Sequence, residues 1–276
     1  MSTKKAYVVG TRVDKSLSPL IFNYWFKKYK IKARYEFKVI KENNFNKEIK
    51  EILKEKNLCG INITIPFKEK IIKKMDKLDR ASKAIKAVNC VTIKNNKYSG
   101  SNTDWLGFKE TLASTLIEKK INIEDHKKVV LIGYGGAAKA VLYSLSLMSP
   151  IWKKNTLVFN RSKKKINSPF VSQKTTISLN KIQNHLSESF LIINTTPRNI
   201  LQDLKIKKIN TRVVVCDIVY KPKQTKFLKH FTKPIAKVYG INMLINQAKP
   251  CFLKWFGVRP SLDKTLMNKL LKEISK

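Results

Sequence analysis

Short apolar segments alternate with amphipathic helical patterns along the chain. This alternation predicts α/β architecture with mainly parallel sheets. In the first part of the chain, the strand-like segments are residues 6–9, 35–39, 60–65, 90–93 and 97–100. The helical patterns in this part cover residues 19–29, 45–56 and 104–118. Asn95-Asn96 lies between the last two of these strands and predicts a β-hairpin.

A second series of strands begins after a polar stretch near residue 122. Its strand-like segments are residues 128–132, 156–159, 190–194 and 213–218. The C-terminal segments, residues 243–256 and 262–274, have helical patterns. We therefore expect two α/β domains that meet near residue 104, and the pattern alone does not say where the last helices pack.

The net charge of +38 raises the possibility of a nucleic-acid partner. Only seven of the 57 basic residues are arginine, the type preferred for phosphate and base recognition. The longest unbroken basic run is Lys163–Lys165, and the other lysines are dispersed. We interpret the charge as a solvated surface that attracts small anions, and we expect no specific nucleic-acid partner.

Cysteine spacing and hydropathy indicate in which cellular compartment the protein is expected. The four cysteines are far apart and form no CxxC pair, so we expect neither a metal site nor a disulfide framework. No apolar run approaches the ~20 residues that cross a bilayer, and the N-terminus has no secretory pattern. A cytoplasmic protein without a membrane partner is the expectation.

A glycine-rich loop follows the apolar strand of residues 128–132. The segment Gly133–Ala138 reads GYGGAA and precedes a helical pattern, which fits the G-x-G-x-x-A fingerprint in its strand–turn–helix context. Such a loop lets the backbone approach a pyrophosphate at the helix N-terminus. The predicted dinucleotide-binding positions of this loop are Gly133, Gly135, Gly136, Ala137 and Ala138.

The end of the next strand distinguishes NADP from NAD. An NAD site has an acidic residue there, whereas this chain has Asn160-Arg161-Ser162, followed by lysines that include Lys165. An arginine fork and a hydroxyl suit a 2′-phosphate. An arginine at this position is also compatible with an ordinary solvated loop. We predict that NADP is the cofactor.

The stretch NITIPFKEK, Asn62–Lys70, places a lysine in an unusual position. Its first four residues are strand-like, and Pro66 suits the first position of a helix because its φ is already helical. Lys68 would then lie in the first helical turn, where the helix dipole disfavours a cation. A lysine that readily gives up its proton there would be useful in catalysis.

With these motifs, the chain resembles the shikimate dehydrogenase family over nearly its whole length. The motifs that carry the resemblance are Lys15–Pro19, Asn62–Lys68, Ala87–Asn89, Asn102–Asp104 with Gly107, the glycine loop, Asn160–Ser162, Asp217–Pro222, and Gly240 with Met243, Leu244 and Gln247. The resemblance implies a substrate-binding domain (1–104), a Rossmann-type NADP-binding domain (105–239), and C-terminal helices (240–276) that pack back on the substrate domain. It also implies reversible NADPH-dependent reduction of 3-dehydroshikimate.

The resemblance implies a role for each motif residue. Lys68 and Asp104 would be the catalytic pair, because the alkoxide formed by hydride transfer needs a proton donor at its oxygen. The substrate carboxylate would be bound by Ser16, Ser18 and Tyr220. The ring hydroxyls would be bound by Asn62, Thr64, Asn89 and Gln247. Further positions on the cofactor would be Thr195, Gly240 and Met243.

Other interpretations stay open. Ser18-Pro19 and Asp104 would also suit ordinary helix N-termini. A quinate/shikimate or aminoshikimate dehydrogenase paralogue is the nearest alternative function, and the sequence does not choose between monomer and homodimer. The chain departs from the family pattern at Arg12, at Lys15, at Cys90, where threonine is usual, and at Pro197–Asn199, beside the nicotinamide.

Overall fold

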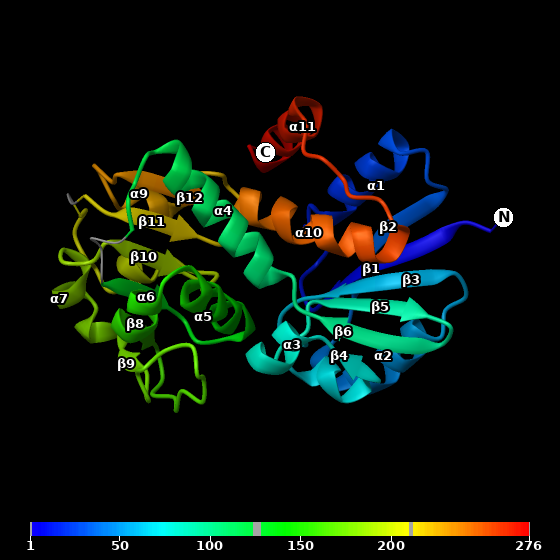
Figure 1. Ribbon diagram of the computed structural model, residues 1–276, viewed down its shortest axis with the longest axis horizontal. Coiled ribbons are helices and arrows are strands. Elements are labelled where there is room, and N and C mark those ends of the chain that lie inside the picture. Colours follow the sequence, from blue (N-terminus) through cyan, green and yellow to red (C-terminus); the bar gives the residue numbers. More distant parts are fainter. Residues whose placement is uncertain (1, 124–127, 210–211, 276) are drawn as a thin grey trace. The chain divides into compact units, whose positions relative to one another are not determined.

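The structure is a computed structural model that describes residues 2–123, 128–209 and 212–275 (Figure 1). The chain divides into two compact units. The first contains the residues up to Asp104 together with Gln247–Lys272, and the second contains Trp105–Asn246 and the last residues from Glu273. Each unit is an α/β structure, which confirms the predicted fold class.

The first unit has a six-stranded mixed sheet. Its strands are β1 (Lys4–Gly10), β2 (Ala33–Val39), β3 (Leu58–Ile63), β4 (Lys77–Leu78), β5 (Cys90–Lys94) and β6 (Lys97–Ser101). They are arranged in the order β2-β1-β3-β5-β6-β4. β1 pairs in parallel with β2 and β3, whereas β5 is antiparallel to β3 and β6. Asn95 and Asn96, both with positive φ, form the turn of the predicted β5–β6 hairpin.

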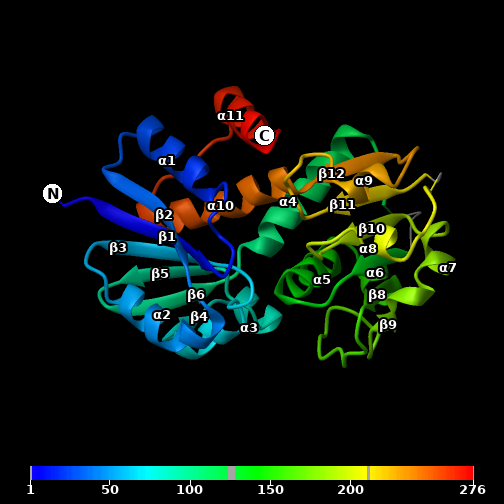
Figure 2. The same ribbon diagram turned by 180° about the vertical axis from the view of Figure 1, so that it is seen from behind.

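Helices cover both faces of this sheet (Figures 1 and 2). The helices of the unit are α1 (Ser18–Lys28), α2 (Phe45–Leu53), α3 (Arg80–Ile85), the part of α10 (Gly240–Phe256) from Gln247 onward, and α11 (Lys264–Ile274) up to Lys272. Tyr7 and Val9 of β1 pack in one apolar cluster with α2. On the other face, α1 and α10 bring together aromatic rings, among them Phe22 and Phe252, whose centroids are 5.8 Å apart. Helix α10, from the C-terminal part of the chain, therefore shares a core with the N-terminal part.

The second unit has a six-stranded, wholly parallel sheet. Its strands are β7 (Val129–Ile132), β8 (Thr156–Asn160), β9 (Ile177–Ser178), β10 (Leu191–Asn194), β11 (Val214–Asp217) and β12 (Ala236–Tyr239). The order is β12-β11-β10-β7-β8-β9. Counted within the unit this is the 3-2-1-4-5-6 order of the Rossmann fold. The strand order reverses between β7 and β10, where such folds bind their ligand.

Apolar side chains of the second unit pack on both faces of its sheet. The helices are α4 (Asp104–Glu118), α5 (Gly136–Met148), α6 (Pro150–Asn155), α7 (Gln183–Leu186), α8 (Ile200–Asp203) and α9 (Lys226–Lys229). Val129 and Leu131 belong to the cluster that includes residues of α4 and α5. Val130 and Ile132 belong to the cluster that includes residues of α7 and α9. Burial on both faces explains why these strands are continuously apolar.

The prediction of a helix that begins at Pro66 is wrong. The segment from Ile65 to Glu69 forms turns after a cis Ile65–Pro66 peptide bond, and a 3₁₀ helix begins only at Lys70. Phe67 is fully buried against Phe45, with ring centroids 4.4 Å apart. The Lys68 carbonyl accepts a 2.8 Å hydrogen bond from Val88 N. These tertiary contacts fix the segment, so the helix-dipole explanation for the lysine does not apply.

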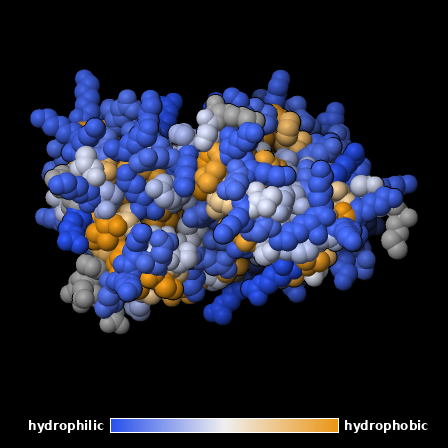
Figure 3. All heavy atoms as spheres, turned by 90° about the horizontal axis from the view of Figure 1, so that it is seen from above, coloured by the Kyte–Doolittle hydropathy of each residue, from blue (hydrophilic) through white to orange (hydrophobic). Residues whose placement is uncertain are grey.

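Hydrophilic residues cover most of the surface face seen in Figure 3, with hydrophobic residues in smaller patches. The run Lys163–Lys165 is exposed, and exposed lysines also occur on α1, α2 and α9. Within the described residues, no helix is both long and apolar enough to cross a membrane.

Gly60 permits a close contact that holds α10 on the first sheet. A Cβ atom at Gly60 would lie 2.0 Å from the indole of Trp255, a ring that stacks on Phe22 with centroids 5.5 Å apart. We expect Gly60→Ala to lower the free energy of unfolding by about 1–3 kcal/mol, because the packed ring has to move. Gly135→Ala is the matched control, since a Cβ there meets nothing within 4 Å. Equal urea midpoints for the two variants would contradict this account.

Asp263 links the start of α11 to α1 and makes stability depend on pH. Its carboxylate accepts hydrogen bonds from Lys28 Nζ (2.6 Å), Tyr24 Oη (2.9 Å) and Leu266 N (2.8 Å). The bond from Lys28 is the main reason that the pKa of Asp263 falls from 3.8 to about 2. A lowered folded-state pKa gives stability that is present above pH 3.8 and is lost as the pH falls toward 2. In thermal unfolding across this range, Asp263→Asn should flatten the acid decline, and an unchanged slope would contradict the assignment.

Candidate active site

Most predicted substrate-site residues of the first unit lie at one edge of its sheet. Ser16 and Ser18 follow the end of β1, and Thr64 and Lys68 follow the end of the parallel strand β3. The antiparallel strand β5 begins at this same edge, immediately after Asn89. β6 returns to the edge and ends at Ser101, just before Asp104. Segments far apart in sequence therefore converge where the parallel strands end.

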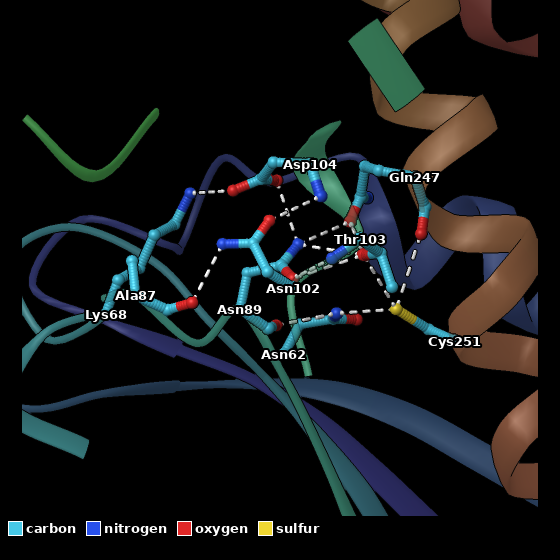
Figure 4. Close-up of polar contacts among 9 residues, drawn as sticks. All are labelled: Asn62, Lys68, Ala87, Asn89, Asn102, Thr103, Asp104, Gln247 and Cys251. Atoms are coloured by element: carbon cyan, nitrogen blue, oxygen red, sulfur yellow. Dashed lines mark hydrogen bonds and ion pairs between the residues drawn. The ribbon is translucent and has the colours of Figure 1, made fainter. Parts of the chain in front are cut away.

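Lys68 and Asp104 form a buried ion pair (Figure 4). Lys68 Nζ lies 2.7 Å from Asp104 Oδ2, and the two side chains are only 12% and 8% exposed. Among the described residues the ammonium has no second hydrogen-bond partner, so two of its three N–H bonds remain able to donate. The Lys68 ammonium is thus a charged donor in a fixed position, with N–H bonds that can still donate to a ligand.

Asn89 and Asn102 fix the Asp104 carboxylate and its backbone. Asn89 Nδ2 donates to Asp104 Oδ1 over 2.8 Å. Asn102 Oδ1 accepts from the Asp104 backbone N–H at 3.1 Å, and its Nδ2 donates to the carbonyl of Ala87 at 2.9 Å. Both carboxylate oxygens of Asp104 are therefore engaged, one by Asn89 and one by Lys68. These bonds stabilise a charge that would otherwise be costly to bury.

A second set of contacts joins Asn89 to α10. Asn89 Nδ2 also lies 2.9 Å from Thr103 Oγ1 and 3.2 Å from Gln247 Oε1. Asn62 Nδ2 donates to the Asn89 carbonyl at 3.1 Å and to Cys251 Sγ at 3.2 Å. We call the side chains of this assembly the buried polar cluster. It consists of Asn62, Lys68, Asn89, Thr103, Asp104, Gln247 and Cys251 (Figure 4).

The two serines lie together at the start of α1. Ser16 Oγ accepts a 3.2 Å hydrogen bond from Ser18 N. Leu17, not Ser18, is the N-cap of α1, so the alternative capping role of Ser18 is wrong. Within the described part of the chain neither serine hydroxyl donates to a protein acceptor. Two hydroxyl donors, one of them on a buried serine, therefore remain available for an anion.

In the second unit, the glycine loop connects β7 to α5. Gly133 has φ +100°, and its N–H donates to the Phe159 carbonyl at 2.8 Å. A Cβ at Gly133 would lie 2.6 Å from Thr195 Oγ1, which brings the predicted cofactor residue Thr195 against the loop. Gly135 is the N-cap of α5, Gly136 and Ala137 begin the helix, and Ala138 is buried. The loop thus has the geometry that accepts a pyrophosphate at a helix N-terminus.

The predicted 2′-phosphate residues follow β8 on the surface. Asn160 Nδ2 donates to the Ser162 carbonyl at 2.9 Å, which closes a tight turn. Arg161, Ser162 and Lys165 are exposed in this turn and the segment after it, and no ion pair to them is seen in the described residues. Their basic and hydroxyl groups remain available to a phosphate.

Buried Asp217 organises the neighbouring strand ends of the second unit. Its carboxylate accepts hydrogen bonds from Asn194 Nδ2 (3.0 Å) and Thr225 Oγ1 (2.5 Å). Burial raises the pKa of the Asp217 carboxyl, and these hydrogen bonds oppose the rise. The half-buried Tyr220 follows three residues later. Gly240 and the buried Met243 belong to the first turns of α10 in the same unit.

Sequence reasoning missed several members of the site. Thr103 and Asn102 lie in a motif that was recognised, but no role was predicted for them. Cys251 follows Gln247 by one helical turn, and this spacing places both on the same face of α10. This spacing in the sequence could have indicated that Cys251 lies beside the predicted site residue Gln247. In the described residues, no group of three or more metal-binding side chains lies together.

Comparisons with known proteins show the family to which the chain belongs. Residues 8–91 match the family described as the shikimate dehydrogenase substrate binding domain. A shikimate dehydrogenase (NADP(+)) of Methanococcus maripaludis is 35% identical over 288 residues, which cover 97% of this chain and 98% of the relative. The chain belongs to the shikimate dehydrogenase family.

Solved structures of the shikimate dehydrogenase family share the fold. A shikimate dehydrogenase crystallised in complex with NADP+ gives a TM-score of 0.78 at 28% identity, covering 99% of this chain and 96% of the other. The Aquifex aeolicus shikimate dehydrogenase gives 0.76 at 29% identity, covering 98% of each chain. The family resemblance inferred from the motifs is confirmed.

The buried ion pair predicts a stability test. Lys68→Met leaves the Asp104 carboxylate buried without its cation, so we expect the free energy of unfolding to fall by about 3–5 kcal/mol. Adding Asp104→Asn should restore part of this loss, because the unpaired charge is removed. Urea unfolding of the single and double variants measures the coupling.

Lys70→Met is the matched control for this test. Lys70 pairs with Glu42 at 3.2 Å, but the side chains are 49% and 58% exposed, so we expect a loss of about 1 kcal/mol or less. Strictly additive losses in the Lys68→Met/Asp104→Asn double variant would contradict a coupled buried pair.

Proposed function

We propose that this chain catalyses the reversible NADPH-dependent reduction of 3-dehydroshikimate to shikimate. The observation that carries the proposal is the Lys68–Asp104 pair, which holds an ammonium with spare N–H bonds at the edge of the first sheet. Membership of the shikimate dehydrogenase family supports it, as does the NADP(+) dependence for which the relatives are named.

Lys68 supplies the proton in this proposal. NADPH, when bound, supplies a hydride to the ketone carbon, and negative charge then develops on the ketone oxygen. A free N–H of Lys68 donates to that oxygen and neutralises it as the alcohol forms. Asp104 keeps the ammonium in place through the 2.7 Å contact to its Oδ2. In the reverse direction, Lys68 accepts the proton from the hydroxyl.

The substrate carboxylate and ring hydroxyls are assigned to different groups. We assign the carboxylate to Ser16 and Ser18, whose hydroxyls keep their donors, with Tyr220 as a further donor. The ring hydroxyls are assigned to Asn62, Thr64, Asn89 and Gln247. Asn62 uses both amide hydrogens within the protein, so it would bind a hydroxyl through Oδ1, which accepts one bond from Tyr35 Oη.

The second unit is assigned to NADP. Its glycine loop would hold the pyrophosphate, because the open space at Gly135 admits a ligand close to the backbone at the N-terminus of α5. Asn160, Arg161, Ser162 and Lys165 would surround the 2′-phosphate. Thr195, Gly240 and Met243 are assigned to the nicotinamide end.

We place this reaction in the cytoplasm. All four cysteines are free thiols, and three of them are buried. Free thiols are typical of a reducing compartment.

The direct test is NADPH oxidation by the purified chain with 3-dehydroshikimate as substrate. We expect turnover with this pair, and much slower turnover with 3-dehydroquinate or with NADH. Comparable rates with 3-dehydroquinate would identify a quinate-accepting paralogue. Absence of turnover with every pair would overturn the proposed function.

Arg161 tests the cofactor assignment. Arg161→Ala should raise the KM for NADPH about tenfold or more and leave the KM for NADH nearly unchanged, because only NADPH has the 2′-phosphate. Arg212→Ala is the control, since Arg212 is also an exposed arginine of the second unit. An equal effect on both cofactors would contradict recognition of the phosphate.

A further inference from the structure

Cys251 belongs to the buried polar cluster but has no role in the proposed chemistry. It lies in α10, and its side chain is fully buried. Its sulfur lies 3.2 Å from Asn62 Nδ2, 3.4 Å from Thr103 Oγ1 and 3.4 Å from the carbonyl oxygen of Gln247 (Figure 4). One thiol therefore contacts a strand of the sheet, the segment that leads to Asp104, and its own helix.

The hydrogen-bond roles around Cys251 follow from what each group can donate. The Cys251 S–H donates to the Gln247 carbonyl one turn earlier in α10. The sulfur lone pairs then accept from Asn62 Nδ2, and the Thr103 hydroxyl can also donate to them. Sulfur, with its long bonds and large radius, reaches these partners at distances longer than those of ordinary O–H and N–H bonds.

These contacts fix the orientation of the Asn62 amide. Its two hydrogens point to the Asn89 carbonyl and to Cys251, and its oxygen accepts from Tyr35 Oη at 2.8 Å. A flipped amide would place its oxygen against the Asn89 carbonyl oxygen and its nitrogen against a hydroxyl donor. Thr103 in turn contacts Asn89, which donates to Asp104.

We propose, on the basis of the proposed function, that Cys251 is a positioning residue for the substrate. Its sulfur holds the Asn62 amide and the Thr103 hydroxyl in the one arrangement that leaves Asn62 Oδ1 facing a ring hydroxyl and Asn89 on Asp104. The effect passes through Asn62 and Thr103, and Cys251 itself does not contact the reacting atoms.

The neighbouring Cys90 supports this assignment. Cys90 is fully buried at the start of β5 and is in hydrogen-bond contact with Cys251. Burial raises the pKa of the Cys90 thiol well above its usual value, so this thiol keeps its proton and can donate toward the Cys251 sulfur. Burial alone would raise the pKa of the Cys251 thiol, but the hydrogen bonds from Cys90, Thr103 and Asn62 lower it below its usual value. The Cys251 sulfur is therefore the acceptor of these hydrogen bonds.

The test compares Cys251→Ala and Cys251→Ser with Cys216→Ala. Cys216 is an equally buried thiol in β11 of the second unit, so its truncation controls for the cavity alone. We expect Cys251→Ala to raise the KM for 3-dehydroshikimate about tenfold, as for a lost hydrogen bond, with the KM for NADPH unchanged. Cys251→Ser keeps a donor and an acceptor and should recover most of the substrate KM.

Two kinetic outcomes overturn the positioning role. One is an unchanged substrate KM in Cys251→Ala. The other is a rise in both KM values together with a loss of melting temperature well beyond that of Cys216→Ala, which would indicate a general structural role.

A second measurement decides the positioning role without turnover. In ¹⁵N-labelled protein, the side-chain NH₂ signals of Asn62 are identified by their loss in Asn62→Ala. We expect these signals to move toward those of exposed amides in Cys251→Ala and to stay in place in Cys216→Ala. Unmoved signals in Cys251→Ala overturn the proposal even if the enzyme is active. If the wild type turns over no substrate but the signals move, the proposed function fails and the role of Cys251 in fixing Asn62 stands.

Discussion

The buried carboxylate of Asp104 is the charge on which the arrangement of the first unit depends. A carboxylate that is 8% exposed requires compensating donors, and here they are the Lys68 ammonium and the Asn89 amide. Asn102 accepts a hydrogen bond from the Asp104 backbone N–H. Each donor comes from a different segment at the edge of the sheet. The charge requirement therefore constrains the turn after β3, the start of β5 and the end of β6 together. The same constraint leaves an ammonium with unused donors, and this is the feature that chemistry at a ketone oxygen requires.

The topology of the first sheet makes this convergence possible. β3 and β6 run in the same direction, and β5 runs between them in the opposite direction. The ends of β3 and β6 therefore lie at the same edge of the sheet as the start of β5. Residues 36 positions apart, Lys68 and Asp104, are thus brought within 2.7 Å. α10 adds Gln247 and Cys251 from the far end of the chain, held by its aromatic contacts with α1. In the second unit, the strand order reverses between β7 and β10. The glycine loop follows β7 and therefore lies at the point where such folds bind their ligand.

Much of the fold follows from local sequence, and the exceptions have physical causes. The apolar strands of the second unit, the Asn95-Asn96 turn and the glycine loop were predictable because backbone geometry or burial on both faces dictates their residue types. The strands β4 and β9 were missed because two residues are too few to show an alternation of apolar and polar positions. The strand β12 was missed as well. The turn at Pro66 was predicted as helix because burial of Phe67 and the Lys68–Val88 backbone bond are tertiary. Cys251 was missed for the same reason, because its partners are distant in sequence.

The most direct test of the account is the single-turnover rate of hydride transfer from NADPH to 3-dehydroshikimate in Lys68→Ala. Proton donation by Lys68 predicts a rate about 10²–10⁴-fold below that of the wild type, with the Kd for shikimate changed much less. A rate within a few-fold of the wild type would show that another group protonates the oxygen. The Lys68–Asp104 pair would then be structural.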